Sequence, residues 1–353
     1  MKIEASRRLE HFQTGIFAAL NEKKEELLAS GKKIYNLSVG TPDFPVFDHI
    51  RKALVEAAQD PEKYHYTLRD LPELHEAVKD YYKKRFDVEI STDEIVAVPG
   101  SQEGVAHLGL TLCIPGDLVL LPNPGYPVFE VGAYLGGAEL YFYELREEND
   151  FLPKFDEIPE DIARRAKYIM VSYPYNPVCA VAPASFYEEL IAYAKKYNII
   201  VVHDNAYSDI IYDGVRGGSF LEFPGAKEVG IECFSLSKSF NLTGARVSFM
   251  IGNREIIDAV KLLRSQYDFG IFEPIQRAAI AALEGPLEPV REQCARYRER
   301  RDALCGGLRS IGWDVRDSQG TMFAWARIPE GFSSSQQFVM ELMVKTGVIC
   351  TPG

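Results

Sequence analysis

Seven short apolar runs recur between residues 95 and 252. They are IVAV (95–98), LVLL (118–121), ELYFYEL (139–145), YIMVSY (168–173), IIVVH (199–203), IECFSLS (231–237) and VSFMIG (247–252). Short, nearly continuous apolar runs are typical of strands that a parallel sheet buries on both faces. The pattern therefore predicts a mostly parallel, seven-stranded sheet.

Longer segments with helical spacing separate these runs. In SFYEELIAYAKKYN (185–198), apolar residues recur at helical spacing, and Ser185 with Glu188 has the spacing of a capping box. Strand, helix and strand in this rhythm predict an α/β fold whose helices flank the sheet.

The last hundred residues have a different pattern. A basic helical stretch, VREQCARYRERRDALCGGL (290–308), is followed by a further helical segment and by VICTPG (348–353). A chain of 353 residues is also longer than one core usually serves. We therefore expect a large domain at 45–265 and a smaller α/β domain formed by 1–44 and 266–353.

Composition and charge narrow the class of partner. Hydrophobic residues make up 46% of the chain and charged residues 25%, which describes an ordinary soluble globular protein. The net charge of -12 would repel a phosphate backbone, so nucleic acid and anionic membranes are poor partners and a small molecule is favoured. The chain has no apolar run long enough to span a bilayer, and its start lacks the apolar core of a signal peptide. These features predict a cytoplasmic protein.

The six cysteines and six histidines stand apart in the sequence. None of the cysteines forms a CxxC pair, and the histidines do not cluster. Scattered cysteines indicate reduced packing residues in a reducing compartment. The same scatter argues against a protein-bound metal.

Residues whose side chains could bind a ligand or take part in a reaction follow five of the predicted strands directly. In open parallel sheets, ligands bind beyond the carboxyl ends of the strands, where loop amides and helix N-termini converge. The chain places there Ser101 with Gln102, Tyr126, Asn176, Asp204 with Tyr207, and Lys238. Singly, each could be a helix cap, a turn residue, a packing aromatic or a surface lysine.

Together these residues match pyridoxal phosphate chemistry. That chemistry needs a lysine to hold the cofactor aldehyde, a carboxylate to keep the pyridine nitrogen protonated, and an anion site for the phosphate. Lys238 and Asp204 would meet the first two needs, and the turn before Ser101 would meet the third.

Spacing around the lysine brings a family resemblance. SLSK with an arginine eight residues after the lysine, Lys238 to Arg246, resembles the class I aminotransferases of the aspartate aminotransferase superfamily, fold type I. Asp204 lies 34 residues before the lysine, and Asn176 lies 28 residues before Asp204. The likeness runs from NLSVGTPDFP (36–45) through YHYTLRDLPELHEAV (64–78) to TGVICTPG (346–353).

The resemblance implies pyridoxal 5'-phosphate as the cofactor and gives each residue a role. Lys238 would carry the Schiff base, and Asp204 would pair with the pyridine nitrogen. The phenolic oxygen would be bound by Asn176 and Tyr207, with Tyr126 stacked on the ring. The phosphate would be bound by Ser101, Gln102, Ser235 and Arg246, joined by Tyr66 from across a homodimer interface with shared active sites. Gly40 and Asn176 would donate to the substrate carboxylate.

The implied activity is transamination between an amino acid and a 2-oxo acid by a ping-pong mechanism. Within the family, the segments HDNAYSDIIYDG (203–214) and SFLEFPGAKEVGIECFSLSKSFNLTGARVSF (219–249) look most like LL-diaminopimelate aminotransferases. Ala245 departs from them, because they commonly carry a large aromatic residue there. Alanine, aspartate and aromatic substrates therefore stay open.

Two other functions share some of these features. A carbon–sulfur β-lyase on the same fold would use every cofactor contact. A transcription regulator with an aminotransferase-like domain would need a fused DNA-binding domain, which neither the first 44 residues nor the charge of -12 supplies.

The sequence also departs from the family pattern in three places. NPVC (176–179) stands where NPTG is usual, and Asp70 stands where a glycine usually precedes PEL. The family continues beyond the final PG and places there the arginine that grips the substrate carboxylate. We therefore expect that arginine beyond Gly353, in a longer enzyme.

Overall fold

The computed structural model describes residues 3–12 and 15–353. The chain forms two compact units, a smaller one of residues 1–41, 308–315 and 326–353, and a larger one of residues 42–307 and 316–325. The division expected from the sequence, 45–265 against 1–44 with 266–353, stays a prediction. Within it, residues 1–2 and 13–14 lie outside the described part of the chain.

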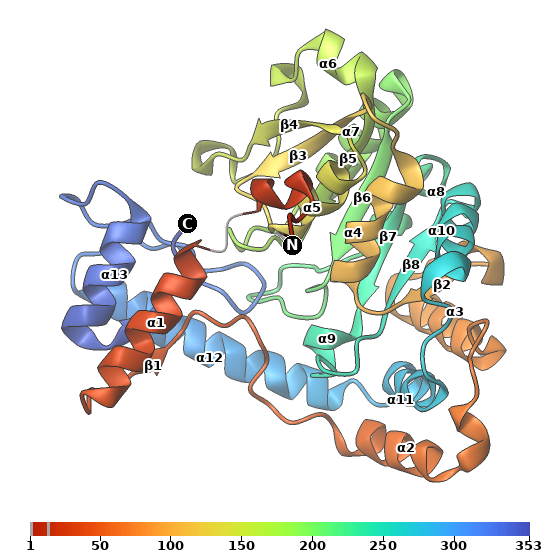
Figure 1. Cartoon of the computed structure of the whole chain (residues 1–353), viewed down its shortest axis with the longest axis horizontal. Helices are drawn as coiled ribbons and strands as arrows, with labels where there is room; N and C mark the ends of the chain where they lie inside the picture. Colours follow the sequence, from red (N-terminus) through yellow and green to blue (C-terminus); the bar gives the residue numbers. More distant parts are fainter. Residues whose placement is uncertain (1–2, 13–14) are drawn as a thin grey trace. The chain divides into compact units, whose positions relative to one another are not determined.

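The elements of the fold can be followed along the chain in Figure 1. The helices are α1 (Gly15–Ala29), α2 (Asp48–Gln59), α3 (Pro72–Phe86), α4 (Ser101–Leu112), α5 (Val128–Leu135), α6 (Glu160–Arg165), α7 (Ala184–Tyr197), α8 (Ala226–Val229), α9 (Leu236–Ser239), α10 (Arg254–Tyr267), α11 (Glu273–Glu284), α12 (Glu288–Ser310) and α13 (Ser335–Thr346). The strands are β1 (Tyr35–Asn36), β2 (Ile95–Val98), β3 (Leu118–Asn123), β4 (Glu139–Glu144), β5 (Ala166–Ser172), β6 (Ile200–Asn205), β7 (Gly230–Ser235), β8 (Ser248–Gly252) and β9 (Val348–Ile349).

The larger unit is built on a seven-stranded sheet with the order β2-β8-β7-β6-β5-β3-β4. Strands β4, β3, β5, β6 and β7 are parallel to one another, whereas β8 is antiparallel to both β2 and β7. Every strand begins and ends within two residues of the predicted run. The prediction of a mostly parallel seven-stranded sheet is confirmed.

One face of the sheet packs against α4, α5 and α10. Val202, Cys233 and Met250 point to this face and share a buried cluster with Leu108 of α4 and Ile257 of α10. Successive side chains of a strand alternate between the two faces, so the residues next to these three belong to the opposite face. This alternation later decides which polar side chains can meet.

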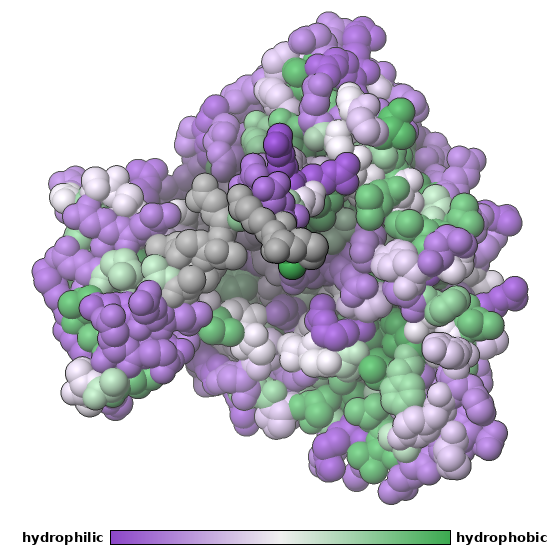
Figure 2. Space-filling model, viewed as in Figure 1, coloured by the Kyte–Doolittle hydropathy of each residue, from purple (hydrophilic) through white to green (hydrophobic). Residues whose placement is uncertain are grey.

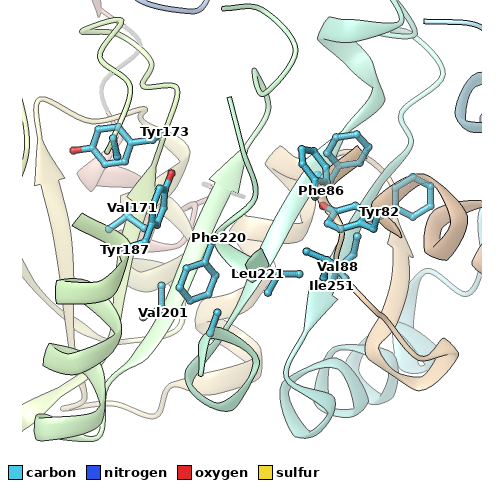
Figure 3. Close-up of a cluster of buried hydrophobic side chains, with 14 of the residues drawn as sticks. Tyr82, Phe86, Val88, Val171, Tyr173, Tyr187, Val201, Phe220, Leu221 and Ile251 are labelled. Carbon is cyan, nitrogen blue, oxygen red and sulfur yellow. The ribbon is translucent and has the colours of Figure 1, made fainter. Parts of the chain in front are cut away.

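The other face packs against α3 and α7, and α11 packs in turn on α3. Figure 3 shows Tyr82 and Phe86 of α3 beside Ile251, and Tyr187 of α7 beside Val171. These aromatic side chains are buried in one continuous cluster. Aromatic residues bury the largest apolar areas, so this face carries much of the unit's hydrophobic stabilisation.

A fully buried carboxylate, Glu232, lies within this aromatic face. It accepts hydrogen bonds from Tyr82 Oη (2.7 Å), Ser219 Oγ (2.8 Å) and the Phe220 amide (2.7 Å), and its Oε2 lies 2.9 Å from His203 Nδ1. Burial opposes ionisation, but the hydrogen bond and charge of His203 outweigh it and lower the pKa of Glu232. The carboxylate therefore ties β7 to β6, to α3 and to the segment at 219–220.

The predicted capping box of Ser185 and Glu188 is wrong. Helix α7 begins one residue earlier, at Ala184, and Pro183 occupies the N-cap position without a side-chain hydrogen bond. Ser185 therefore lies inside the first turn of α7. A side chain accepts hydrogen bonds from the first free amides only from the N-cap position, so Ser185 does not cap the helix.

The smaller unit has its own core and a two-stranded parallel sheet. Strand β1 pairs with β9, with Tyr35 opposite Val348. Leu20 of α1 packs with Phe338 and Met343 of α13 in a buried cluster. None of the helices in the described residues combines the length and apolar character needed to cross a bilayer.

We expect Glu232→Gln to lower the free energy of unfolding by about 3 kcal/mol, because the amide cannot accept all the buried hydrogen bonds that the carboxylate accepts from Tyr82, Ser219 and Phe220. Urea denaturation at pH 7 measures this. Glu228→Gln is the matched control, since its carboxylate pairs with Lys195 at the surface (2.6 Å), where such pairs contribute about 0–1 kcal/mol. Equal losses in the two variants would contradict the assigned role of Glu232.

Candidate active site

The carboxyl ends of β6 and β7 bring the central residues to one edge of the sheet. Asp204 of β6 pairs with Cys233 of β7, two residues before Ser235. Because β8 runs the other way, its first residue, Ser248, pairs with Ser235 and with Val98, the last residue of β2. The ends of β2, β6 and β7 and the start of β8 therefore lie along the same edge.

The polar residues at this edge also share one face. Asp204, Ser235 and Ser248 each stand two residues from a member of the cluster that packs on α4, namely Val202, Cys233 and Met250. By the alternation of strand side chains, all three point toward the α4 face. His203 and Glu232 are one residue out of step and point to the aromatic face.

Lys238 lies on the short helix α9, which follows β7 directly. Ser235 is the N-cap of this helix, and its Oγ accepts a hydrogen bond from the Ser237 amide (3.2 Å). Burial and then the positive charge of Arg246 lower the pKa of Lys238, although Asp204 opposes the shift. The lowered pKa favours the neutral amine, which is the nucleophilic form of lysine.

Asp204 has the opposite tendency. Its Oδ1 atom is buried and has no hydrogen-bond partner within the described residues. Burial raises the pKa of Asp204 to about 6, although the charges of His203 and Lys238 pull it down. The charges of neighbouring residues therefore offset only part of the cost of ionising Asp204 at the strand end.

A cationic site lies at the start of α4. Gly100, with φ +94°, is the N-cap residue, and a Cβ atom there would lie 2.2 Å from Nη2 of Arg246. Only a residue without a side chain lets the guanidinium lie against this turn. Arg246 Nη1 also donates to the Thr243 carbonyl (3.1 Å). A guanidinium beside the free amides of a helix N-terminus suits a phosphate group.

Three hydroxyl groups line up behind this turn. Ser101 Oγ lies 3.2 Å from Ser248 Oγ, which lies 3.1 Å from Ser235 Oγ. The structure thus brings together two predicted phosphate ligands, Ser101 and Ser235, through a third serine. Ser248 was missed in the sequence analysis, because a serine at the start of an apolar strand gives no signal of its own.

Tyr126 lies in the turn after β3 and is half-buried against the α4 cluster. Its hydroxyl donates to Gln102 Oε1 (3.1 Å), so these two predicted cofactor ligands contact each other. Burial and the charge of Asp204 raise the pKa of Tyr126, and Arg246 opposes them. Tyr126 is therefore electrostatically coupled to both Asp204 and Arg246, and its stacking role stays a prediction.

Tyr207 is buried and packs edge-on against Phe323, with ring centres 5.7 Å apart. Burial, followed by the charge of Asp204, raises the pKa of Tyr207. Its phenol therefore stays protonated and can act as a hydrogen-bond donor. Asn176 is half-buried in the turn after β5, where the Cys179 amide donates to the Tyr175 carbonyl (2.8 Å).

Two further predicted residues are Tyr66 and Gly40. The Tyr66 side chain is 86% exposed, and its ring centre is 6.0 Å from that of Phe269. Gly40 belongs to the smaller unit. Their roles across a dimer interface and at the substrate carboxylate stay predictions.

These observations fit pyridoxal 5'-phosphate. The unpartnered oxygen of Asp204 suits a protonated ring nitrogen, and the Gly100 turn with Arg246 suits the phosphate. The amine of Lys238, with its lowered pKa, suits the aldehyde. Each requirement of the cofactor thus meets a group with the matching charge or hydrogen-bonding capacity.

Comparison with known proteins gives the same answer. A family model described as aminotransferase class I and II matches residues 32–353. The LL-diaminopimelate aminotransferase of Dehalococcoides mccartyi is 42% identical over 353 residues, which is 99% of this chain and 91% of that protein.

Two solved structures extend the comparison. Substrate-bound BacF from Bacillus subtilis is 38% identical, with a TM-score of 0.94 over 100% of this chain and 90% of that chain. A single mutant of Thermus thermophilus aspartate aminotransferase is 25% identical, with a TM-score of 0.92 over 99% of this chain and 92% of that chain.

We expect Asp204→Asn to raise the free energy of unfolding of the cofactor-free protein at pH 7.5 by about 1–3 kcal/mol. The folded-state pKa of Asp204 is raised from 3.8 to about 6. The stability that the protonated carboxyl contributes is therefore present below pH 3.8 and is lost as the pH rises through 6. Asparagine stays neutral throughout, so the gain should vanish between pH 7 and pH 4.

Urea unfolding at several pH values checks this pH dependence. Asp258→Asn is the matched control, because Asp258 is exposed. It forms only a surface ion pair, with 3.6 Å between its Oδ2 and Arg254 Nε. The substitution should change the free energy of unfolding by less than about 0.5 kcal/mol at every pH. A gain in Asp204→Asn that is independent of pH would contradict the raised pKa.

Proposed function

Because this chain belongs to the class I and II aminotransferases, we propose that the strand-end site around Lys238 is its active site. The family, fold and enzyme class expected from the sequence are confirmed. The protein is a pyridoxal-phosphate-dependent aminotransferase that uses amino acid and 2-oxo acid substrates. The relatives described above give no support to the β-lyase alternative.

One observation carries the assignment of the site. Asp204 lies at the carboxyl end of β6, and Lys238 directly follows the adjacent strand β7. The pKa of the acid is raised and that of the amine is lowered. Titratable groups whose pKa values are perturbed by burial and by a specific charged neighbour, as both of these are, are typical of catalytic sites.

The chain's own groups suggest a division of labour. When bound, pyridoxal phosphate supplies an electron sink for the bond that is broken at the substrate Cα. Lys238 would hold the cofactor and, once released, would take the proton from Cα and return it as a general base and acid. Asp204 would accept the hydrogen bond of the protonated ring nitrogen. Tyr207 and Asn176 would hold the phenolic oxygen.

The phosphate would be held at the start of α4. Arg246 would supply a forked pair of charged donors, and the amides that follow Gly100 would add the partial positive charge of a helix N-terminus. The linked hydroxyls of Ser101 and Ser235 would add one further donor. Gln102 already bonds Tyr126, so it would position that ring beside the cofactor.

We propose LL-diaminopimelate as the amino donor. Support comes from the 42% identity to the D. mccartyi enzyme of that name and from the likeness of residues 203–214 and 219–249. Ala245, which departs from that group, is half-buried and packs on the aromatic core. Catalysis would follow a ping-pong mechanism.

We also propose a cytoplasmic homodimer with shared active sites. Tyr64, Tyr66, Leu68 and Phe272 are exposed apolar or aromatic residues close in sequence to α2 and α11. Figure 2 shows apolar side chains on the surface over these helices, amid a largely hydrophilic surface. Burying such residues in a subunit interface would bring Tyr66 toward a neighbouring active site.

Lys238→Ala should abolish covalent attachment of the cofactor and lower turnover at least about a thousandfold, because it removes the general base as well as the anchor. Borohydride reduction followed by intact-mass measurement reads the attachment separately from activity. Lys195→Ala, which removes a surface lysine paired with Glu228, is the control and should behave as wild type. Cofactor mass retained in Lys238→Ala would refute the assignment.

An amino-donor panel with 2-oxoglutarate tests the proposed substrate. We expect kcat/KM for LL-diaminopimelate to exceed that for alanine, aspartate or phenylalanine by at least about tenfold, the scale of one well-placed polar contact. Another donor at the top of the panel would overturn the substrate assignment alone. Pyruvate and ammonia released from cystathionine without a 2-oxo acid would instead identify a lyase.

A further inference from the structure

Ser248 is the first residue of β8 and is completely buried. It pairs with the last residue of β2 on one side and the last residue of β7 on the other. Its Oγ lies 3.2 Å from Ser101 Oγ and 3.1 Å from Ser235 Oγ. One buried hydroxyl therefore joins two serines that come from different elements, α4 and β7.

The position of Ser248 follows from the direction of β8. A strand parallel to its neighbours would begin at the opposite edge of the sheet, away from the turn at Gly100. Because β8 is antiparallel to β2 and β7, its first side chain lies where both neighbours end. Within the described sheet, Ser248 is the only strand residue that pairs with the last residues of two neighbouring strands.

The number of hydroxyl protons limits the hydrogen bonds that Ser248 and its two neighbours can donate. Each serine hydroxyl carries one proton, so Ser248 can donate to only one of its two neighbours. To keep both hydrogen bonds, it must accept from the other neighbour, whose proton is then used in the bond to Ser248. The row of three hydroxyls consequently has one proton left to donate outward, from Ser101 or Ser235.

An anion at the start of α4 would set the direction of this row. A phosphate group accepts hydrogen bonds, and Arg246 with the Gly100 turn gives it a cationic place beside Ser101. Hydrogen bonds that run in one direction polarise and strengthen one another. The outward bond to the phosphate would therefore gain from the two bonds behind it.

We propose that Ser248 is a positioning residue for the cofactor phosphate. It orients the hydroxyls of Ser101 and Ser235 and does not itself contact the phosphate. This inference rests on the proposed function, because it takes the phosphate site of that function as given. It adds a residue at an antiparallel strand start to the groups that determine cofactor affinity.

Paired ligands give a test that a purely structural role would not pass. Apoenzyme would be titrated with pyridoxal phosphate and with pyridoxal, which lacks the phosphate, by isothermal titration calorimetry. Ser248→Ala should raise Kd for pyridoxal phosphate about threefold to tenfold, the scale of one neutral hydrogen bond, and leave Kd for pyridoxal unchanged. An equal change for both ligands, or none for either, would overturn the proposal.

Three further variants separate the outcomes. Ser219→Ala removes another buried hydroxyl, which bonds Glu232 on the opposite face (2.8 Å), and should leave both Kd values unchanged. Ser248→Cys keeps the side-chain shape with a weaker donor, and should show a smaller phosphate-selective loss if the alanine variant does not fold. Arg246→Ala should weaken pyridoxal phosphate binding at least about tenfold.

Arg246→Ala also distinguishes the two proposals from each other. Affinity lost in Arg246→Ala but kept in Ser248→Ala would overturn the role of Ser248 alone. Affinity kept in both variants would overturn the phosphate site of the proposed function, and the role of Ser248 with it.

Discussion

A carboxylate with one buried, unpartnered oxygen is the constraint on which the rest of this structure depends. Asp204 Oδ1 meets no donor from the described residues, and burial raises the pKa of Asp204 to about 6. Such a group costs stability unless a ligand supplies the missing charge. The sheet must therefore be held firmly by other interactions, and the aromatic packing of α3 and α7 on the opposite face supplies them.

The two faces of the sheet treat neighbouring acids in contrasting ways. Glu232 faces α3 and accepts three hydrogen bonds besides its contact with His203. Asp204, paired with the residue after Glu232, faces α4 and keeps one oxygen without a partner. The first acid joins elements of the fold, whereas the second is left ready for a ligand. A shift of one residue along a strand is enough to separate these two functions.

Much of this arrangement could be predicted because buried parallel strands have a strong sequence signal. Their apolar runs located all seven strands of the large sheet, and the residues after them located Asp204 and Lys238. The direction of β8 gives no such signal, so Ser248 was missed. Asp70 was seen only as a departure from the family pattern, although its Oδ2 accepts the Ala97 amide (2.8 Å) and contacts His75 (3.1 Å). Long-range pairing of that kind cannot be deduced from local pattern.

The reversal of β8 also explains why the lysine and the arginine stand so close in sequence. The connection between β7 and β8 leaves and re-enters the sheet at the same edge, so Lys238, near its start, and Arg246, near its end, stay at that edge. A crossover to a parallel strand would carry the second residue to the far edge of the sheet. The eight-residue interval between Lys238 and Arg246 is therefore possible because β8 is antiparallel to β7. In a chain without a structure, a conserved interval of this length would report the local topology as well as the chemistry.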